Sequence, residues 1–153
     1  MKYISFAIII SLLFTRCKEE QHTDKDRELV ITYLGFKKRL HEKYYKLKNK
    51  KNSLGEDILD GVRLVYYKNG KLNGIENYKD GLLDGWDYSY DTDGKKLGEI
   101  LWKANFSNNT SETIIVINYS YYEDRKLATI YVCDKTGKVV SETSYDKNGN
   151  IIP

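Results

Sequence analysis

Histidine is scarce in this chain of 153 residues. Both copies, His22 and His41, precede residue 59, so the rest of the chain has no imidazole for acid–base catalysis or for a Ser–His or Cys–His pair. It also lacks the commonest metal-binding side chain. We therefore expect no enzyme activity, no metal site and no cofactor.

Only two cysteines occur. Cys133 lies in the apolar run 128–133, and we interpret it as a small buried hydrophobe rather than a reactive thiol. The other is Cys17, and if it carries a lipid the chain can form no intramolecular disulfide. Packing alone would then hold the fold.

Four aspartates cluster at Asp84, Asp87, Asp91 and Asp93. A carboxylate pair can act as acid and base, but Asp beside a turn glycine is favoured because it hydrogen-bonds its own backbone. We adopt the structural interpretation. Calcium binding is not expected either, because Trp102 stands where a loop beginning at Asp91 would need a Glu.

Charge of one sign is not in excess. Lys and Arg number 25 against 22 Asp and Glu, and residues 59–153 alone have 12 basic and 14 acidic side chains, a net charge of about −2. This balance argues against nucleic-acid binding. The glycines are spaced for hairpins rather than for a phosphate-binding loop.

No hydrophobic run is long enough to span a bilayer, which takes roughly 20 apolar residues. Residues 4–14 are mostly apolar and follow the basic Lys2. These are the dimensions of a secretory signal peptide, which we predict over residues 1–16.

Cys17 follows this run directly, and the segment resembles the lipobox of bacterial lipoproteins, although Arg16 stands where that family has a small residue. The resemblance implies lipid attachment at Cys17, a tether over residues 17–25, and export to the cell envelope. Residues 18–20, Lys-Glu-Glu, are similar to a charged signal that directs lipoproteins to the outer membrane. An ordinary secretory leader, with Cys17 incidental, is the alternative.

Apolar residues recur every three to four positions after residue 24, which is the spacing of one helical stripe. The pattern predicts a helix over residues 26–48, within an amphipathic segment of residues 26–50. Between Lys37 and Lys51 there are eight basic residues and one acid. Contact with anionic lipid headgroups is one interpretation of this excess, and a solvated face is the other. The stripe consists of Leu29, Tyr33, Phe36, Leu40, Tyr44 and Leu47.

From residue 60 the pattern changes to short runs rich in Tyr, Val, Ile and Thr, separated by Asn-Gly or Asp-Gly. These glycines supply the positive φ of tight hairpin turns. A repeat of 24 residues aligns Asp60-Gly61 with Asp84-Gly85, and a half-repeat of 11 lies within it. Such spacing predicts an antiparallel meander. We expect strands near 62–67, 73–78, 86–91, 97–103, 113–121, 127–133 and 139–145, with an irregular loop over 105–110.

Two strands indicate how the sheet is covered. Residues 86–90 alternate aromatic and polar side chains, so that strand should be half-buried. Residues 113–119 are apolar on both faces at their start, which predicts a second cover. The expected fold is therefore mainly β, a meander of repeated hairpins with one N-terminal amphipathic helix packed on the sheet.

The spacing of aromatic residues and glycines resembles MORN repeats, whose core has an aromatic, two residues, Gly, three residues and Gly. The resemblance implies an elongated sheet of stacked hairpins over residues 59–153, used as a scaffold or binding surface. Bacterial members are commonly lipoproteins or are labelled antitoxins. The matches are Tyr67, Gly70, Gly74; then Tyr78, Gly81, Gly85; and, slightly stretched, Tyr90, Gly94, Gly98.

Ten of the 14 tyrosines and both tryptophans fall within residues 59–153. Such side chains fill a core or bind a partner. We expect a non-catalytic lipoprotein that binds an envelope protein or glycan, and an antitoxin neutralising a partner toxin is the alternative. An acidic-aromatic patch over residues 84–93 would favour the toxin, and a groove of aromatics the glycan. The candidate binding residues are Tyr88, Tyr90, Trp102, Tyr66 and Tyr78.

Overall fold

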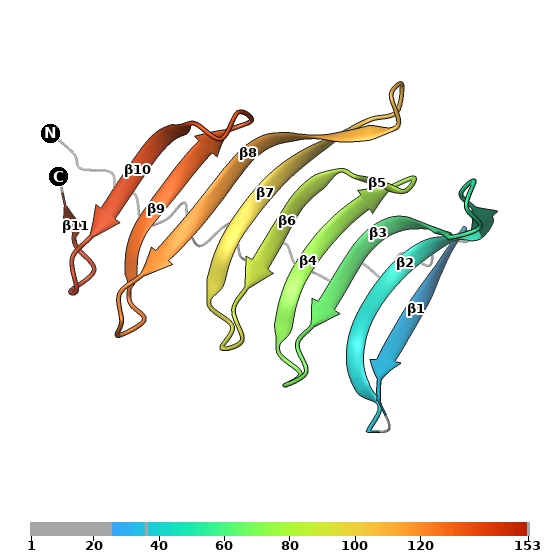
Figure 1. Ribbon diagram of the computed structural model, residues 1–153, viewed down its shortest axis with the longest axis horizontal. Coiled ribbons are helices and arrows are strands. Elements are labelled where there is room, and N and C mark those ends of the chain that lie inside the picture. Colours follow the sequence, from blue (N-terminus) through green and yellow to red (C-terminus); the bar gives the residue numbers. More distant parts are fainter. Residues whose placement is uncertain (1–25, 36, 153) are drawn as a thin grey trace, which may run out of the picture.

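The computed structural model describes residues 26–35 and 37–152, and they form one antiparallel sheet of 11 strands (Figure 1). Each strand pairs with the next along the chain, except that the short β5 pairs only with β4, and β6 takes the next place. The predicted meander is confirmed. The strands are β1 Arg27–Leu34, β2 Arg39–Lys51, β3 Asp57–Tyr66, β4 Leu72–Lys79, β5 Leu82–Leu83, β6 Gly85–Tyr90, β7 Lys96–Asn105, β8 Thr110–Tyr121, β9 Leu127–Asp134, β10 Val139–Tyr145 and β11 Ile151–Ile152.

The strands expected after residue 60 all exist, with ends that move by a few residues. The segment predicted as an irregular loop, 105–110, is instead the tip of the β7–β8 hairpin, whose strands pair up to Asn105↔Thr110. A tight turn fits there because Asn109 adopts a positive φ of 52°, which Asn tolerates better than most residues.

The predicted N-terminal helix is wrong. Its residues form the β1–β2 hairpin, in which Val30 pairs with Tyr44 and Glu28 with Lys46. The chain reverses at Gly35, whose φ is +67°. Two properties favour strands here: the β-branched and aromatic run 30–33, and a free edge of β3 to which β2 can add.

The cover predicted over residues 113–119 is also wrong, since no helix packs on the sheet within the described part of the chain. Ile114 is 39% exposed. The register explains the sequence pattern: Leu101 pairs with Ile115 but Trp102 pairs with Thr113, so one residue of β8 is extra at this point. Such a bulge interrupts the in–out alternation and leaves consecutive apolar residues without a second layer.

One five-residue turn occurs six times, and it explains the repeat. In each copy the first N–H donates to the fifth C=O and the fourth N–H donates to the first C=O. The fourth residue has a positive φ. It is glycine in five copies, and in the copy that begins at Tyr122 it is Arg125, at φ +67°. The copies begin at Asn52, Tyr67, Asp91, Tyr122, Asp134 and Asp146.

Few side chains are fully buried, as expected of a single layer. The interior of the described part consists of Leu47, Ala104, Cys133 and Asp60, each 8% exposed. Cys133 is therefore a buried free thiol, as predicted. Asp60 is paired with Arg27 at 3.1 Å. Most apolar side chains are half-buried, so they stabilise the sheet while remaining partly exposed.

Candidate binding surfaces

The two faces of the sheet differ in chemistry. Cross-strand partners share a face, so the register defines a continuous row from β3 to β9. We call this set the Tyr88 row: Leu64, Ile75, Tyr88, Glu99, Ile117 and Val132, each paired with the next. All six are half-buried, and no described segment lies over them. The row is a mainly apolar strip across six strands.

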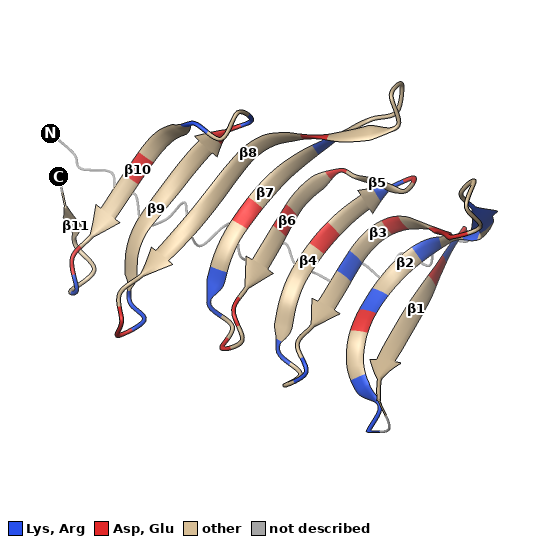
Figure 2. Ribbon diagram, in the orientation of Figure 1, with Lys and Arg blue, Asp and Glu red and all other residues tan. Residues whose placement is uncertain are grey.

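The opposite face is more polar, and we call it the polar face. Its centre is Arg63, which bridges Glu42 at 2.6 Å and Glu76 at 2.9 Å. Tyr78 donates its hydroxyl hydrogen to Glu76 at 3.0 Å. Burial, together with the Glu76 charge, raises the pKa of Tyr78 to about 12. Figure 2 shows basic and acidic positions side by side in the middle of β2, β3 and β4.

A shallow groove of about 260 Å³ lies on the polar face. Small residues form its floor, because Gly74 pairs with Ser89 and Ser89 with Gly98. Asp87 lines one side and accepts a hydrogen bond from the Asn77 N–H at 3.0 Å. Burial raises the pKa of Asp87 to about 6, and the Glu76 charge adds to the effect.

Lys96 organises the middle of the other face. Its ammonium lies 3.0 Å from Glu99 and 4.9 Å from the centre of the Tyr88 ring, and 5.8 Å from that of Tyr119. Tyr119 donates its hydroxyl hydrogen to Glu99. Burial raises the pKa of Tyr119, and the neighbouring Glu99 carboxylate raises it further. The ammonium, the carboxylate and the two rings thus form one local cluster that includes Tyr88 and Glu99 of the row.

The five predicted binding residues do not form one site. Tyr88 belongs to the Tyr88 row, whereas Tyr78 and Trp102 lie on the polar face, because Trp102 pairs with Gly85, two residues from Asp87. The Trp102 indole N–H is buried without a hydrogen bond in the described residues, although Trp102 is near enough to lower the pKa of Asp87 slightly. The remaining two lie near strand ends.

Those two are Tyr90 and Tyr66. The Tyr90 carbonyl accepts the Tyr67 hydroxyl hydrogen at 2.7 Å, and Tyr145 accepts that of Tyr122 in the same way at 2.6 Å. Each of these two hydrogen bonds joins a turn to the turn about one 24-residue repeat further along the chain. Only the backbone of Tyr90 takes part in this link, whereas Tyr66 lines a pocket.

The clustered aspartates mostly serve the backbone. Asp91 Oδ1 accepts from the N–H groups of Asp93 and Lys95, and Asp84 accepts from that of Ala104 at 3.1 Å. Arg125 pairs with Asp91 at 2.7 Å and with Asp93 at 2.9 Å. Asp84 and Asp87 therefore make separate contacts, whereas Asp91 and Asp93 share Arg125. No group of three or more His, Cys, Asp or Glu in the described residues is arranged to hold a metal.

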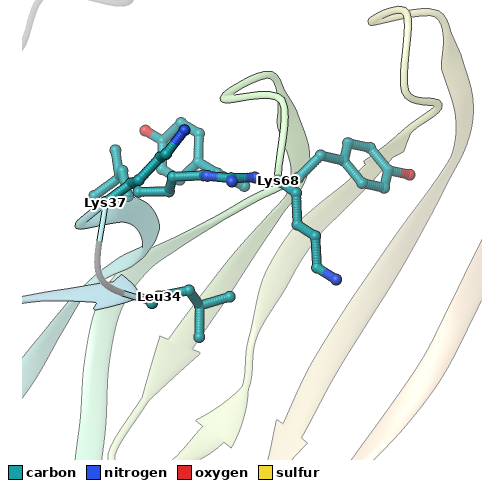
Figure 3. Close-up of a pocket in the computed structure, with 8 residues that line it drawn as sticks. Leu34, Lys37 and Lys68 are labelled. Atoms are coloured by element: carbon teal, nitrogen blue, oxygen red, sulfur yellow. The ribbon is translucent and has the colours of Figure 1, made fainter.

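A pocket of about 540 Å³ lies between the β1–β2 turn and the turn after β3; we call it the terminal pocket. Leu34 lies at the end of β1, and Lys37 and Lys68 lie on the two turns (Figure 3). Of its residues the sequence indicated only Tyr66. The excess of basic residues between Lys37 and Lys51 could have indicated the pocket, but the sequence analysis assigned these residues to a helix rather than to the β1–β2 turn and β2.

No family model matches the chain, and no curated protein matches it. A solved protein of unknown function from Bacteroides fragilis is 17% identical, with 85% of this chain and 91% of that chain covered and a TM-score of 0.22. That score supports no argument about fold or function. The register itself defines the class: an open, single-layer antiparallel β-sheet protein.

Within residues 26–35 and 37–152, no helix has the length and apolar character needed to cross a membrane. The predicted signal peptide, the lipid-attachment residue Cys17 and the tether lie outside the described residues.

Proposed function

We propose that this protein is a non-catalytic lipoprotein, exported and anchored through Cys17, whose sheet binds another component of the cell envelope, a protein or a glycan. The observation that carries the proposal is the Tyr88 row. It is a half-buried strip across six strands with no described segment over it. Aromatic and aliphatic side chains in such a strip give a partner contact area at low entropic cost.

An exposed apolar residue beside the row supports the same proposal. Val62 is 38% exposed. Val62 lies on the face of the row, because it pairs with Asn77, one residue beyond the Arg63–Glu76 pair. Large apolar surface that stays exposed on a folded protein commonly marks an interaction site.

The alternative, an antitoxin for a basic toxin, needs a free acidic-aromatic patch over residues 84–93. Asp84 and Asp91 accept backbone hydrogen bonds, and Arg125 pairs with two of the four carboxylates. The acids are therefore engaged within the sheet, so the alternative has the weaker support.

Affinity capture tests the proposal. The full chain, solubilised in mild detergent, is exposed to envelope and cytosolic fractions of the source cell, and retained material is identified by mass spectrometry. We expect an envelope protein or glycan that elutes under mild conditions and is lost with Val62→Lys. One stoichiometric protein that only denaturant releases would instead support the antitoxin alternative.

A further inference from the structure

The terminal pocket exists because two neighbouring strands separate. The β2–β3 ladder begins at Glu42↔Val65, and beyond that pair the start of β2 and the end of β3 have no register pairs. The β1–β2 turn and the turn after β3 then enclose a concavity between them. The gap between the two hairpin ends thus follows from the point at which the β2–β3 pairing stops.

The pocket wall combines apolar and basic groups. Four of its side chains are apolar or aromatic: Leu34, Leu40, Tyr66 and Tyr67. Three are cationic: Lys37, Arg39 and Lys68. Among the described residues, none of those that line it is acidic.

The cations of the pocket differ from the arginines elsewhere in the described part of the sheet, which are paired with carboxylates. Within the described residues, Lys37, Arg39 and Lys68 make no ion pair, whereas Arg63 and Arg125 each bridge two carboxylates. Like charges around one concavity repel each other, and no carboxylate of the described part of the chain pairs with these three side chains to offset that repulsion. A bound anion would supply the missing counter-charge.

We propose that the terminal pocket binds a small molecule with a phosphate or carboxylate group on an apolar or aromatic body. The anion lies among the two lysines and the arginine, whose planar guanidinium suits two oxygens at once. The body packs on Leu34, Leu40 and the tyrosine rings. The volume falls in the usual range for ligand sites, roughly 300–1,000 Å³. This site is separate from the Tyr88 row and does not depend on the function proposed for it.

The test measures binding of 2-naphthyl phosphate to the full chain in phosphatidylcholine nanodiscs, with the neutral 2-naphthyl β-glucoside for comparison. We expect saturable one-to-one binding of the phosphate that is at least about tenfold tighter than that of the glucoside and that weakens as salt increases. Equal binding of both compounds, or no binding of the phosphate at millimolar concentration, would overturn the proposal.

Variants assign the binding to the pocket. Replacing Lys37, Arg39 and Lys68 by Gln should weaken binding at least about 30-fold, because three charge-assisted contacts are lost. The matched control replaces three lysines on turns toward the other end of the sheet and should bind within twofold of the wild type. All substituted residues are exposed, so the fold should survive. A triple variant that binds as the wild type does would contradict the site. The control lysines are Lys126, Lys135 and Lys147.

Lipid composition identifies the source of the anion. If anionic lipid headgroups occupy the pocket, nanodiscs of phosphatidylglycerol will compete with 2-naphthyl phosphate. If the ligand is a soluble anion, the lipid exchange will leave its affinity unchanged. Either result accords with a pocket for anions and assigns where its ligand comes from.

Discussion

At the residue scale, the polar face contains a carboxylate that burial makes hard to ionise. The pKa of Asp87 is about 6, above the ordinary value near 4. The folded state therefore binds this proton more tightly than the unfolded state does. Asp87 favours folding below about pH 4, and that contribution is lost as the pH rises through about 6.

We predict that Asp87→Asn stabilises the protein at pH 7, by about 1 kcal/mol after allowance for partial exposure. The amide oxygen can still accept the Asn77 N–H, while the cost of the charge disappears. Urea unfolding at pH 4 and pH 7 measures the effect. The variant should lose less stability than the wild type over this range; a parallel pH profile would show that Asp87 has an ordinary pKa.

Arg125 has a backbone conformation that is unfavourable for a residue other than glycine. It occupies the turn position that is glycine in the other five copies, at a φ of +67°. Such a φ is unfavourable for a side chain with Cβ. Its ion pairs with Asp91 and Asp93 offset the strain, and those exposed pairs weaken in salt.

We predict that Arg125→Gly changes the melting temperature little at low salt but raises it by a few degrees relative to the wild type in 1 M NaCl. Salt screens the ion pairs that only the wild type has, whereas the backbone strain stays. Arg125→Ala, which loses the ion pairs and keeps the strain, is the control and should be less stable than both. Equal salt dependence of wild type and glycine variant would refute the compensation.

At the element scale, turns were predictable from the sequence and the first hairpin was not. Each turn is set by a few neighbouring residues, so Gly70 or Gly94 can be read locally. The first hairpin depends on pairing with distant strands. Its three-to-four spacing fits a helix, yet in the sheet Leu29 shares a face with Tyr45, and Tyr44 lies on the opposite face. Tertiary pairing overrode the pattern.

The candidate site was predicted only in part for a related reason. Tyrosine content indicated aromatic binding residues, and Tyr88 does lie in the open row. The alternation of residues 86–90 could not reveal which face is open, because that depends on what packs against the sheet. The terminal pocket also needed the correct strand assignment of residues 27–51. The MORN resemblance stays a prediction.

Neighbouring strands approach each other closely at Gly98 and Gly74. A Cβ on Gly98 would lie 3.0 Å from the Ile117 carbonyl oxygen, whereas one on Gly74 would lie 3.4 Å from that of Tyr88. Both glycines form the groove floor and neither has a positive φ. We expect Gly98→Ala to cost about 1–3 kcal/mol, because backbone must shift, and Gly74→Ala clearly less. Chemical unfolding measures both; equal costs would mean that β7 and β8 lie farther apart.

At the scale of the whole molecule, the sheet is a single open layer whose stability comes from strand ladders and from side chains shared between neighbouring turns. Tyr67 to Tyr90 and Tyr122 to Tyr145 are two copies of one such link. With so little enclosed core, most of the apolar side chains that stabilise the sheet remain partly exposed. The Tyr88 row is uncovered because the described part of the chain forms no second layer.

The central claim is that the partner lies on the Tyr88 row, and paired tyrosine variants test it most directly. Tyr88 and Tyr131 are both half-buried, but Tyr131 pairs with Asn118 and lies on the polar face. With the captured partner and the full chain, we expect Tyr88→Ser to raise the dissociation constant at least about tenfold and Tyr131→Ser to change it less than threefold. Equal losses, or a larger loss for Tyr131→Ser, would contradict the account.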